Sequence, residues 1–145
     1  MSLDGEYDES NIFARMIRGE IPTARIWEDD ETLAFMDLFP QSRGHCLVVS
    51  KTSRARNLVE IEPGALCTLM VGVQRTARAL RTALQPDGIV LTQFNGAPAG
   101  QTVFHLHVHI IPRWEGVALT GHGTAEMTDA TALSELARTI RAAMD

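Results

Sequence analysis

Three of the chain's five histidines stand at alternate positions, in the run His105-Leu106-His107-Val108-His109. Strict alternation of polar and apolar residues predicts a half-buried β-strand, because successive side chains of a strand point to opposite faces. On such a strand Leu106 and Val108 face the core, and the imidazoles share the other face at spacings of about 6.6–6.8 Å. The chain must therefore fold around a sheet that can satisfy three polar rings on one face.

The rest of the chain supplies strands before and after one long helix. Strands are expected over residues 24–27, 32–37, 44–50, 89–93 and 102–111, with Pro112 closing the last one. An apolar stripe predicts a helix over residues 63–84, with shorter helices over 11–18 and 129–145. This order predicts one α+β domain over residues 1–145 with a mainly antiparallel sheet. Residues 1–9 are acidic and polar, and we expect them to be disordered or foreign to the natural chain.

Composition excludes several classes of function. The net charge of -5 and the absence of a long Lys/Arg run argue against a surface for DNA or RNA. No stretch approaches the ~18 consecutive apolar residues of a membrane span, and the N-terminus lacks the pattern of a secretory signal. Cys46 and Cys67 form no C-x-x-C pair, so we expect two buried, reduced thiols and a cytoplasmic protein.

Three imidazoles on one face allow two kinds of chemistry. Histidines at alternate strand positions can share a metal ion, although residues 101–113 offer no carboxylate to complete a mixed ligand set. An imidazole nitrogen is also a good nucleophile at neutral pH, and its neighbours can orient it and move protons. The loop over residues 95–102 favours a phosphate substrate, because its small residues let backbone N–H groups approach an anion.

Residues 100–113, Gly-Gln-Thr-Val-Phe-His-Leu-His-Val-His-Ile-Ile-Pro-Arg, resemble the signature of the histidine triad (HIT) family of nucleotide hydrolases and transferases, bacterial type. Residues 12–22, 28–37 and 44–49 resemble family segments in the same order. The resemblance implies a five-stranded antiparallel sheet with one long helix. It also implies a homodimer formed through that helix and an edge strand.

The resemblance further implies a role for each matching residue. His107 would attack the α-phosphorus of a purine nucleotide, and water would release a nucleoside monophosphate from the resulting nucleotidyl-histidine. His105 and His45 would support the ring of His107 through hydrogen bonds. Asp37 would hold the ribose hydroxyls. The implied phosphate ligands are Asn95, Gly100, Gln101, Thr102 and His109. The implied apolar base pocket consists of Ile12, Phe13, Met16, Ile21, Phe35, Leu38 and Leu47.

One departure from the family pattern concerns zinc. Many bacterial members bind structural zinc through two cysteines and a histidine, and this chain has Asn11, Ala14 and Ser53 at those positions. We therefore expect no metal there and no cofactor. Three functions fit the sequence: a hydrolase of nucleoside phosphoramidates or dinucleoside polyphosphates, a nucleotide-binding regulator without turnover, and a histidine metalloprotein.

Overall fold

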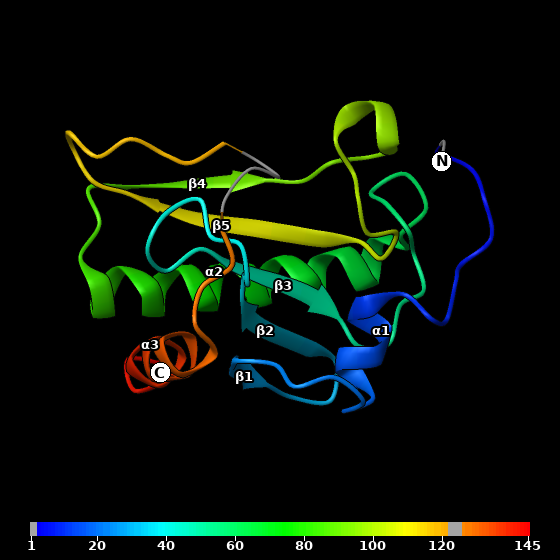
Figure 1. Ribbon diagram of the computed structural model, residues 1–145. Helices are drawn as coiled ribbons and strands as arrows, with labels where there is room; N and C mark the ends of the chain where they lie inside the picture. Colours follow the sequence, from blue (N-terminus) through cyan, green and yellow to red (C-terminus); the bar gives the residue numbers. More distant parts are fainter. Residues whose placement is uncertain (1–2, 122–125) are drawn as a thin grey trace.

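One antiparallel sheet of five strands, in the order β1-β2-β3-β5-β4, organises the chain (Figure 1). The computed structural model describes residues 3–121 and 126–145. The elements are α1 (Ile12–Ile17), β1 (Arg25–Glu28), β2 (Thr32–Met36), β3 (Cys46–Ser50), α2 (Pro63–Leu84), β4 (Gly88–Thr92), the 3-10 helix η1 (Ala97–Ala99), β5 (His107–Arg113) and α3 (Ala130–Arg141). The predicted α+β fold, with its antiparallel sheet and one long helix, is confirmed. Within the described ranges, no helix is both long enough and apolar enough to cross a membrane.

Alternation along the three central strands gives the sheet two different faces. One face joins the main core under α2 and α3, through residues such as Met36, Val48 and Ile110. The other face carries a smaller apolar cluster, which α1 covers. That cluster consists of Phe13, Leu33, Phe35, Leu47 and Val49. His107 pairs with Val49 and His109 with Leu47, so both imidazoles extend from the face that α1 covers.

The helices begin and end where the sequence provides local signals. The Asn11 side chain accepts a hydrogen bond from the Ala14 N–H and caps α1. Pro63 occupies the first turn of α2, where its missing N–H costs nothing. A Cβ on Gly72 would lie 2.7 Å from Thr32 Cγ2, so the glycine allows α2 to approach β2 closely. This contact sets the distance between the helix and the sheet.

Three sequence expectations need correction. β5 begins at His107 instead of residue 102, because the chain bends over residues 103–105 before it enters the sheet. It continues through Pro112, where β3 no longer pairs and only β4 does, so the missing proline N–H is not required on the β3 side. Cys46 is buried as expected, but Cys67 is exposed on α2.

Residues 3–9 were expected to be disordered or foreign to the chain. The structure instead gives them defined contacts. The Leu3 carbonyl accepts hydrogen bonds from Arg56 and Asn57, and the Tyr7 hydroxyl reaches His105.

Candidate active site

His107 is held so that one specific ring nitrogen is available. Its Nδ1 lies 2.7 Å from the His105 carbonyl oxygen, and because a carbonyl can only accept, Nδ1 must carry the proton. In the neutral ring, Nε2 therefore keeps its lone pair. The Phe13 ring packs edge-on against the imidazole with 4.8 Å between centroids. The result is a buried imidazole with a fixed orientation and Nε2 as its nucleophilic atom.

The His105 carbonyl thus hydrogen-bonds to His107, and the His105 ring has partners of its own. It lies just before β5, and its Nε2 donates to the Ser50 carbonyl at 2.9 Å. Tyr7 Oη lies 2.6 Å from the remaining nitrogen, Nδ1. Burial is the main cause that lowers the pKa of His105 to about 4, so the ring is neutral at pH 7. His105 supports His107 through its backbone carbonyl, whereas its ring bonds to other residues.

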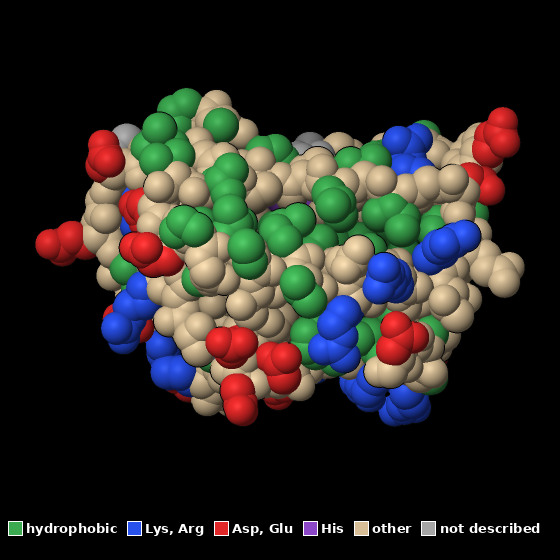
Figure 2. Space-filling model, turned by 180° about the vertical axis from the view of Figure 1, so that it is seen from behind, with side chains coloured by type: hydrophobic (Ala, Val, Ile, Leu, Met, Phe, Trp, Pro, Cys, Tyr) green, Lys and Arg blue, Asp and Glu red, His purple; other side chains and the backbone are tan. Residues whose placement is uncertain are grey.

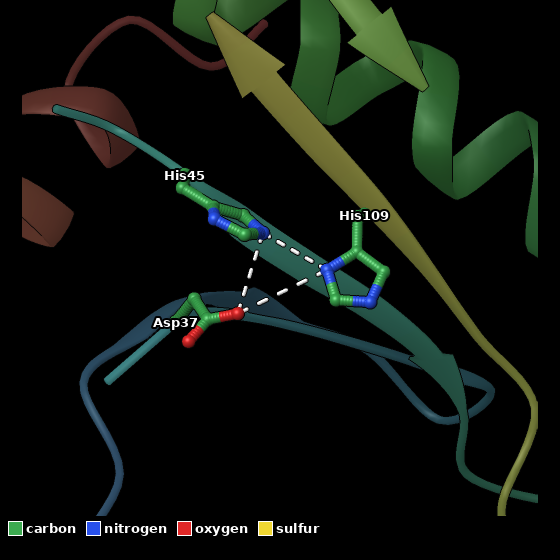
Figure 3. Close-up of side chains that lie close together, drawn as sticks. All are labelled: Asp37, His45 and His109. Atoms are coloured by element: carbon green, nitrogen blue, oxygen red, sulfur yellow. Dashed lines mark hydrogen bonds and ion pairs between the residues drawn. The ribbon is translucent and has the colours of Figure 1, made fainter. Parts of the chain in front are cut away.

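His45 contacts His109 (Figure 3). The Gln41 N–H donates to His45 Nδ1 at 2.9 Å, which leaves the proton of the neutral ring on Nε2. That Nε2 lies 2.9 Å from His109 Nδ1, so His45 donates and His109 accepts. The proton of a neutral His109 is then on its own Nε2. His109 is thereby set up as a hydrogen-bond donor, while His107 is set up as a nucleophile.

Asp37 brings a carboxylate to this pair from the end of β2. Its Oδ2 lies 3.3 Å from His45 Nε2 and 3.9 Å from His109 Nδ1, as Figure 3 shows. The three side chains offer ligand atoms within 4.8 Å of one another, which is the arrangement a metal ion needs. A metal would require the lone pair of His45 Nε2, but the Gln41 hydrogen bond places the proton there. The geometry therefore favours a hydrogen-bonded group over a metal site.

The phosphate-loop candidates are largely engaged within the protein. The Gln101 amide accepts from the Gly96 N–H at 2.8 Å and donates to the carbonyls of Arg56 and Val103 at 2.6 and 3.0 Å. Its side chain is 3% exposed, so it shapes the loop and has no amide hydrogen left for a phosphate. Asn95 similarly bonds to the Gln93 side chain and to the Leu58 N–H.

What the loop can offer an anion is its backbone and one hydroxyl. Gly96 and Gly100 have φ values of 87° and 105°, which side-chain-bearing residues rarely adopt. Thr102 is exposed at the end of the loop. The N–H groups of Gly96, Ala99, Gly100 and Gln101 donate within the loop, and Pro98 has none. The candidate phosphate ligands from this loop are therefore the N–H groups of Ala97 and Thr102 and the Thr102 hydroxyl.

The expected base-pocket residues divide into a buried floor beside His107 and three more exposed residues. Phe13, Phe35 and Leu47 are buried together beside His107, and Met16 packs against them. Ile12 and Leu38 are 42% and 39% exposed, and Ile21 is partly buried before β1. The buried apolar floor is the candidate contact surface for a flat aromatic base.

Comparison with known proteins gives the family. The sequence profile of the HIT domain matches residues 18–116, which is more than half of the chain. The chain belongs to the HIT family. The Bacillus subtilis protein named Protein hit is 41% identical over 106 residues, which make up 73% of this chain and 72% of that protein.

Two further relatives extend the comparison. The crystal structure of a HIT-like protein from Bartonella henselae, described as involved in cell-cycle regulation and as holding an unknown ligand, is 47% identical with a TM-score of 0.90. The match covers 97% of this chain and 100% of that one. The Arabidopsis thaliana protein named adenylylsulfatase HINT3 is 37% identical over 117 residues, which are 77% of this chain and 59% of that protein. The HIT family thus includes hydrolases.

Asn11, Ala14 and Ser53, which the resemblance set at zinc-ligand positions, make other contacts in this structure. Asn11 caps α1, Ala14 is buried beneath it, and the Ser53 hydroxyl accepts from the Ala55 N–H. None of the three supplies a thiol or an imidazole. His122 lies outside the described residues.

Three residues of this HIT site had no signal in the sequence. Tyr7 bonds to His105 from the N-terminal segment, and the Gln41 backbone fixes the tautomer of His45. The Phe94 ring packs edge-on against His109 with 5.7 Å between centroids. Each acts through a contact between segments that are far apart in the chain. A single Tyr, Gln or Phe in a loop does not predict such a contact.

Proposed function

We propose that this HIT protein hydrolyses nucleoside phosphoramidates or phosphoanhydrides at the α-phosphate through a covalent nucleotidyl-His107 intermediate. The observation that carries the proposal is the hydrogen bond from His107 Nδ1–H to the His105 carbonyl, which leaves Nε2 with its lone pair. A buried imidazole held in this tautomer is a positioned nucleophile. The product is a nucleoside monophosphate.

The chemistry divides into two displacements at phosphorus. In the first, His107 Nε2 forms a bond to the α-phosphorus, and the leaving group departs with the electron pair of the broken bond. The His105 carbonyl stabilises the positive charge that develops on the ring. In the second, water attacks the phosphorus, loses a proton to solvent, and the imidazole leaves as the neutral ring. His107 Nδ1 keeps its proton throughout, so neither step requires a tautomer change.

His109 and the preceding loop meet the negative charge of the phosphate. The His45–His109 hydrogen bond directs the His109 proton to Nε2, where it can donate to a phosphoryl oxygen. Loop N–H groups and Thr102 supply further donors. An anhydride leaving group departs as a stable anion, whereas an amine must gain a proton from solvent as it leaves, and the water of the second step returns one.

The buried floor of Phe13, Phe35 and Leu47 supports a purine ring, and Asp37 is the candidate for the ribose hydroxyls. The name of the Arabidopsis relative supports the inclusion of an adenylyl sulfate among the substrates to be tested. The two free cysteines fit a reducing compartment, and we propose the cytoplasm as the site of action.

The test is a substrate panel measured with the wild-type protein and the His107→Ala variant. The panel contains adenosine phosphoramidate, diadenosine polyphosphates and adenylyl sulfate. We expect release of AMP from at least one substrate and a loss of about 10⁴-fold or more in the variant. Tight binding of AMP without turnover of any substrate would favour the regulator. Stoichiometric metal, with activity abolished by a chelator, would favour the metalloprotein.

We further propose that the protein is a homodimer. β4 is an edge strand, and apolar side chains lie exposed beside it on α2 and the preceding loop. Figure 2 shows hydrophobic side chains gathered across the face of the molecule that is turned away from the viewer in Figure 1. The exposed large apolar residues on and beside β4 are Leu58, Met70 and Leu91, which line one hollow.

An apolar patch beside an unpaired edge strand suits a second copy, because a two-fold axis lets the same patch cover itself. Light scattering is expected to report a dimer for the wild type and a monomer for Leu91→Lys. A monomeric wild type at micromolar concentration would contradict the dimer.

A further inference from the structure

The N-terminal segment 3–8 forms a strap across the loop that follows β3. The Leu3 carbonyl accepts hydrogen bonds from Arg56 Nη1 at 3.2 Å and Asn57 Nδ2 at 2.9 Å. A Cβ built on Gly5 would lie 3.0 Å from the guanidinium carbon of Arg56, so the strap backbone packs directly on this group. Arg56 is 1% exposed. The strap is thus anchored on a buried cation two residues before Tyr7.

Arg56 also connects the strap to the entrance of β5. Its guanidinium stacks over the Phe104 ring with 5.1 Å to the centroid, and Phe104 directly precedes His105. Its carbonyl accepts from the Gln101 amide, which shapes the phosphate loop. One residue therefore fixes the strap, the loop and the start of the triad relative to one another.

Tyr7 connects the anchored strap to the triad through a hydrogen bond to His105. The Ser50 carbonyl takes the proton of His105 Nε2, so Nδ1 presents a lone pair and the Tyr7 hydroxyl donates to it at 2.6 Å. The two rings meet edge-on with 5.7 Å between centroids. His105 is 2% exposed, so an unmet Nδ1 would be a buried polar atom without a partner. Tyr7 satisfies it.

The charges around this contact agree with a neutral His105 and a protonated Tyr7. The titratable groups facing the His105 ring are the Tyr7 phenol and the His107 imidazole, and burial is the main cause of the low pKa of His105, about 4. Burial also raises the pKa of the Tyr7 phenol, whose charged neighbours are Glu9, Arg54 and Arg18. Tyr7 is thus kept as a donor.

We propose that Tyr7 is a positioning residue of this site: its hydroxyl satisfies Nδ1 and holds the orientation of the His105 ring, and through the His105 carbonyl it fixes the nucleophile His107. Only the effect on kcat rests on the proposed function. The effect on the His105 ring concerns the free protein and needs no substrate. Without the hydroxyl, the His105 ring can turn or take up a proton, and the carbonyl that orients His107 Nδ1–H loses its support.

The experiment compares Tyr7→Phe with Ser10→Ala. Both remove one hydroxyl from the chain before α1, but the Ser10 hydroxyl donates to Asp8 on the surface, away from His105. Histidine ¹⁵N NMR spectra of the free protein report tautomers and titration. In wild type and Ser10→Ala we expect a single Nε2–H tautomer for His105 that stays neutral down to pH 5. In Tyr7→Phe we expect a His105 pKa raised by about one unit or more, because Nδ1 is free to take up a proton.

Two further measurements test the proposal, one on a second variant and one on kinetics. Gly5→Leu leaves the hydroxyl in place but pushes the strap off Arg56, and we expect the His105 spectrum of Tyr7→Phe. Against a substrate of the wild type, Tyr7→Phe should lose about tenfold in kcat with KM changed less than twofold. Identical His105 spectra in wild type and Tyr7→Phe would overturn the proposal. Because the spectra need no substrate, that result is distinguishable from failure of the proposed hydrolase activity.

Discussion

Replacement of Gln101 by Ala tests whether this amide builds the phosphate loop or binds the phosphate. The substitution removes three hydrogen bonds and leaves the Gly96 N–H and the Arg56 carbonyl without their partner in a buried region. At about 1 kcal/mol for each hydrogen bond, the free energy of unfolding should fall by about 3 kcal/mol. For a domain of this size that corresponds to a decrease in Tm of about 6–12 °C.

The assay is urea denaturation followed by circular dichroism, with Gln101→Met as the matched variant. Met fills the space without making the hydrogen bonds, so it should lose nearly as much stability as Ala. If the amide bound the phosphate directly, Gln101→Ala would weaken nucleotide binding and leave stability unchanged. A loss below about 1 kcal/mol in both variants would refute the loop-building role.

Three further predictions concern other parts of the molecule. A thiol reagent should modify Cys67 in the native protein and Cys46 only on unfolding, because Cys46 is fully buried with a raised pKa; rapid modification of both would contradict this. The pKa of His105 is about 4 in the folded protein and 6.5 in its ordinary state, so only the unfolded chain takes up a proton between these values. The contribution of His105 to the free energy of unfolding is therefore complete above pH 6.5 and falls by about 3 kcal/mol as the pH drops to about 4. Urea titrations should show this loss, and His105→Asn should show a smaller one. Gly72→Ala should destabilise by about 1–3 kcal/mol in the same assay, because its Cβ would meet Thr32 Cγ2 at 2.7 Å, and an unchanged midpoint would exclude the close helix–sheet contact.

The fold was predictable where one physical pattern decides it. Alternation placed His107 and His109 on the face opposite Val108 because strand side chains point alternately to the two faces. The exposure of Cys67 was also predictable from the sequence. Cys67 lies two residues from Leu69 and so falls outside the helical stripe that contains Leu69 and Val73. The start of β5 was misplaced because alternation continues through residues that bend before the sheet.

Individual roles within the site were harder to predict, because they depend on contacts between distant segments. His45 meets His109 because the Leu47–His109 pairing brings the start of β3 beside β5. Gln101 faces Arg56 because two loops cross. Neither contact can be predicted from a local sequence pattern. The resemblance assigned roles to these residues, and the hydrogen bonds decide which nitrogen of each ring carries the proton.

The most direct test of the central claim is mass spectrometry of the protein quenched during turnover of adenosine phosphoramidate or a diadenosine polyphosphate. Quenching at alkaline pH preserves a phosphorus–nitrogen bond to histidine. The account predicts an increase in mass by one adenylyl group, located by peptide mapping on His107 and absent from His107→Ala. An adduct on another residue, or undiminished turnover by His107→Ala, would contradict His107 as the nucleophile.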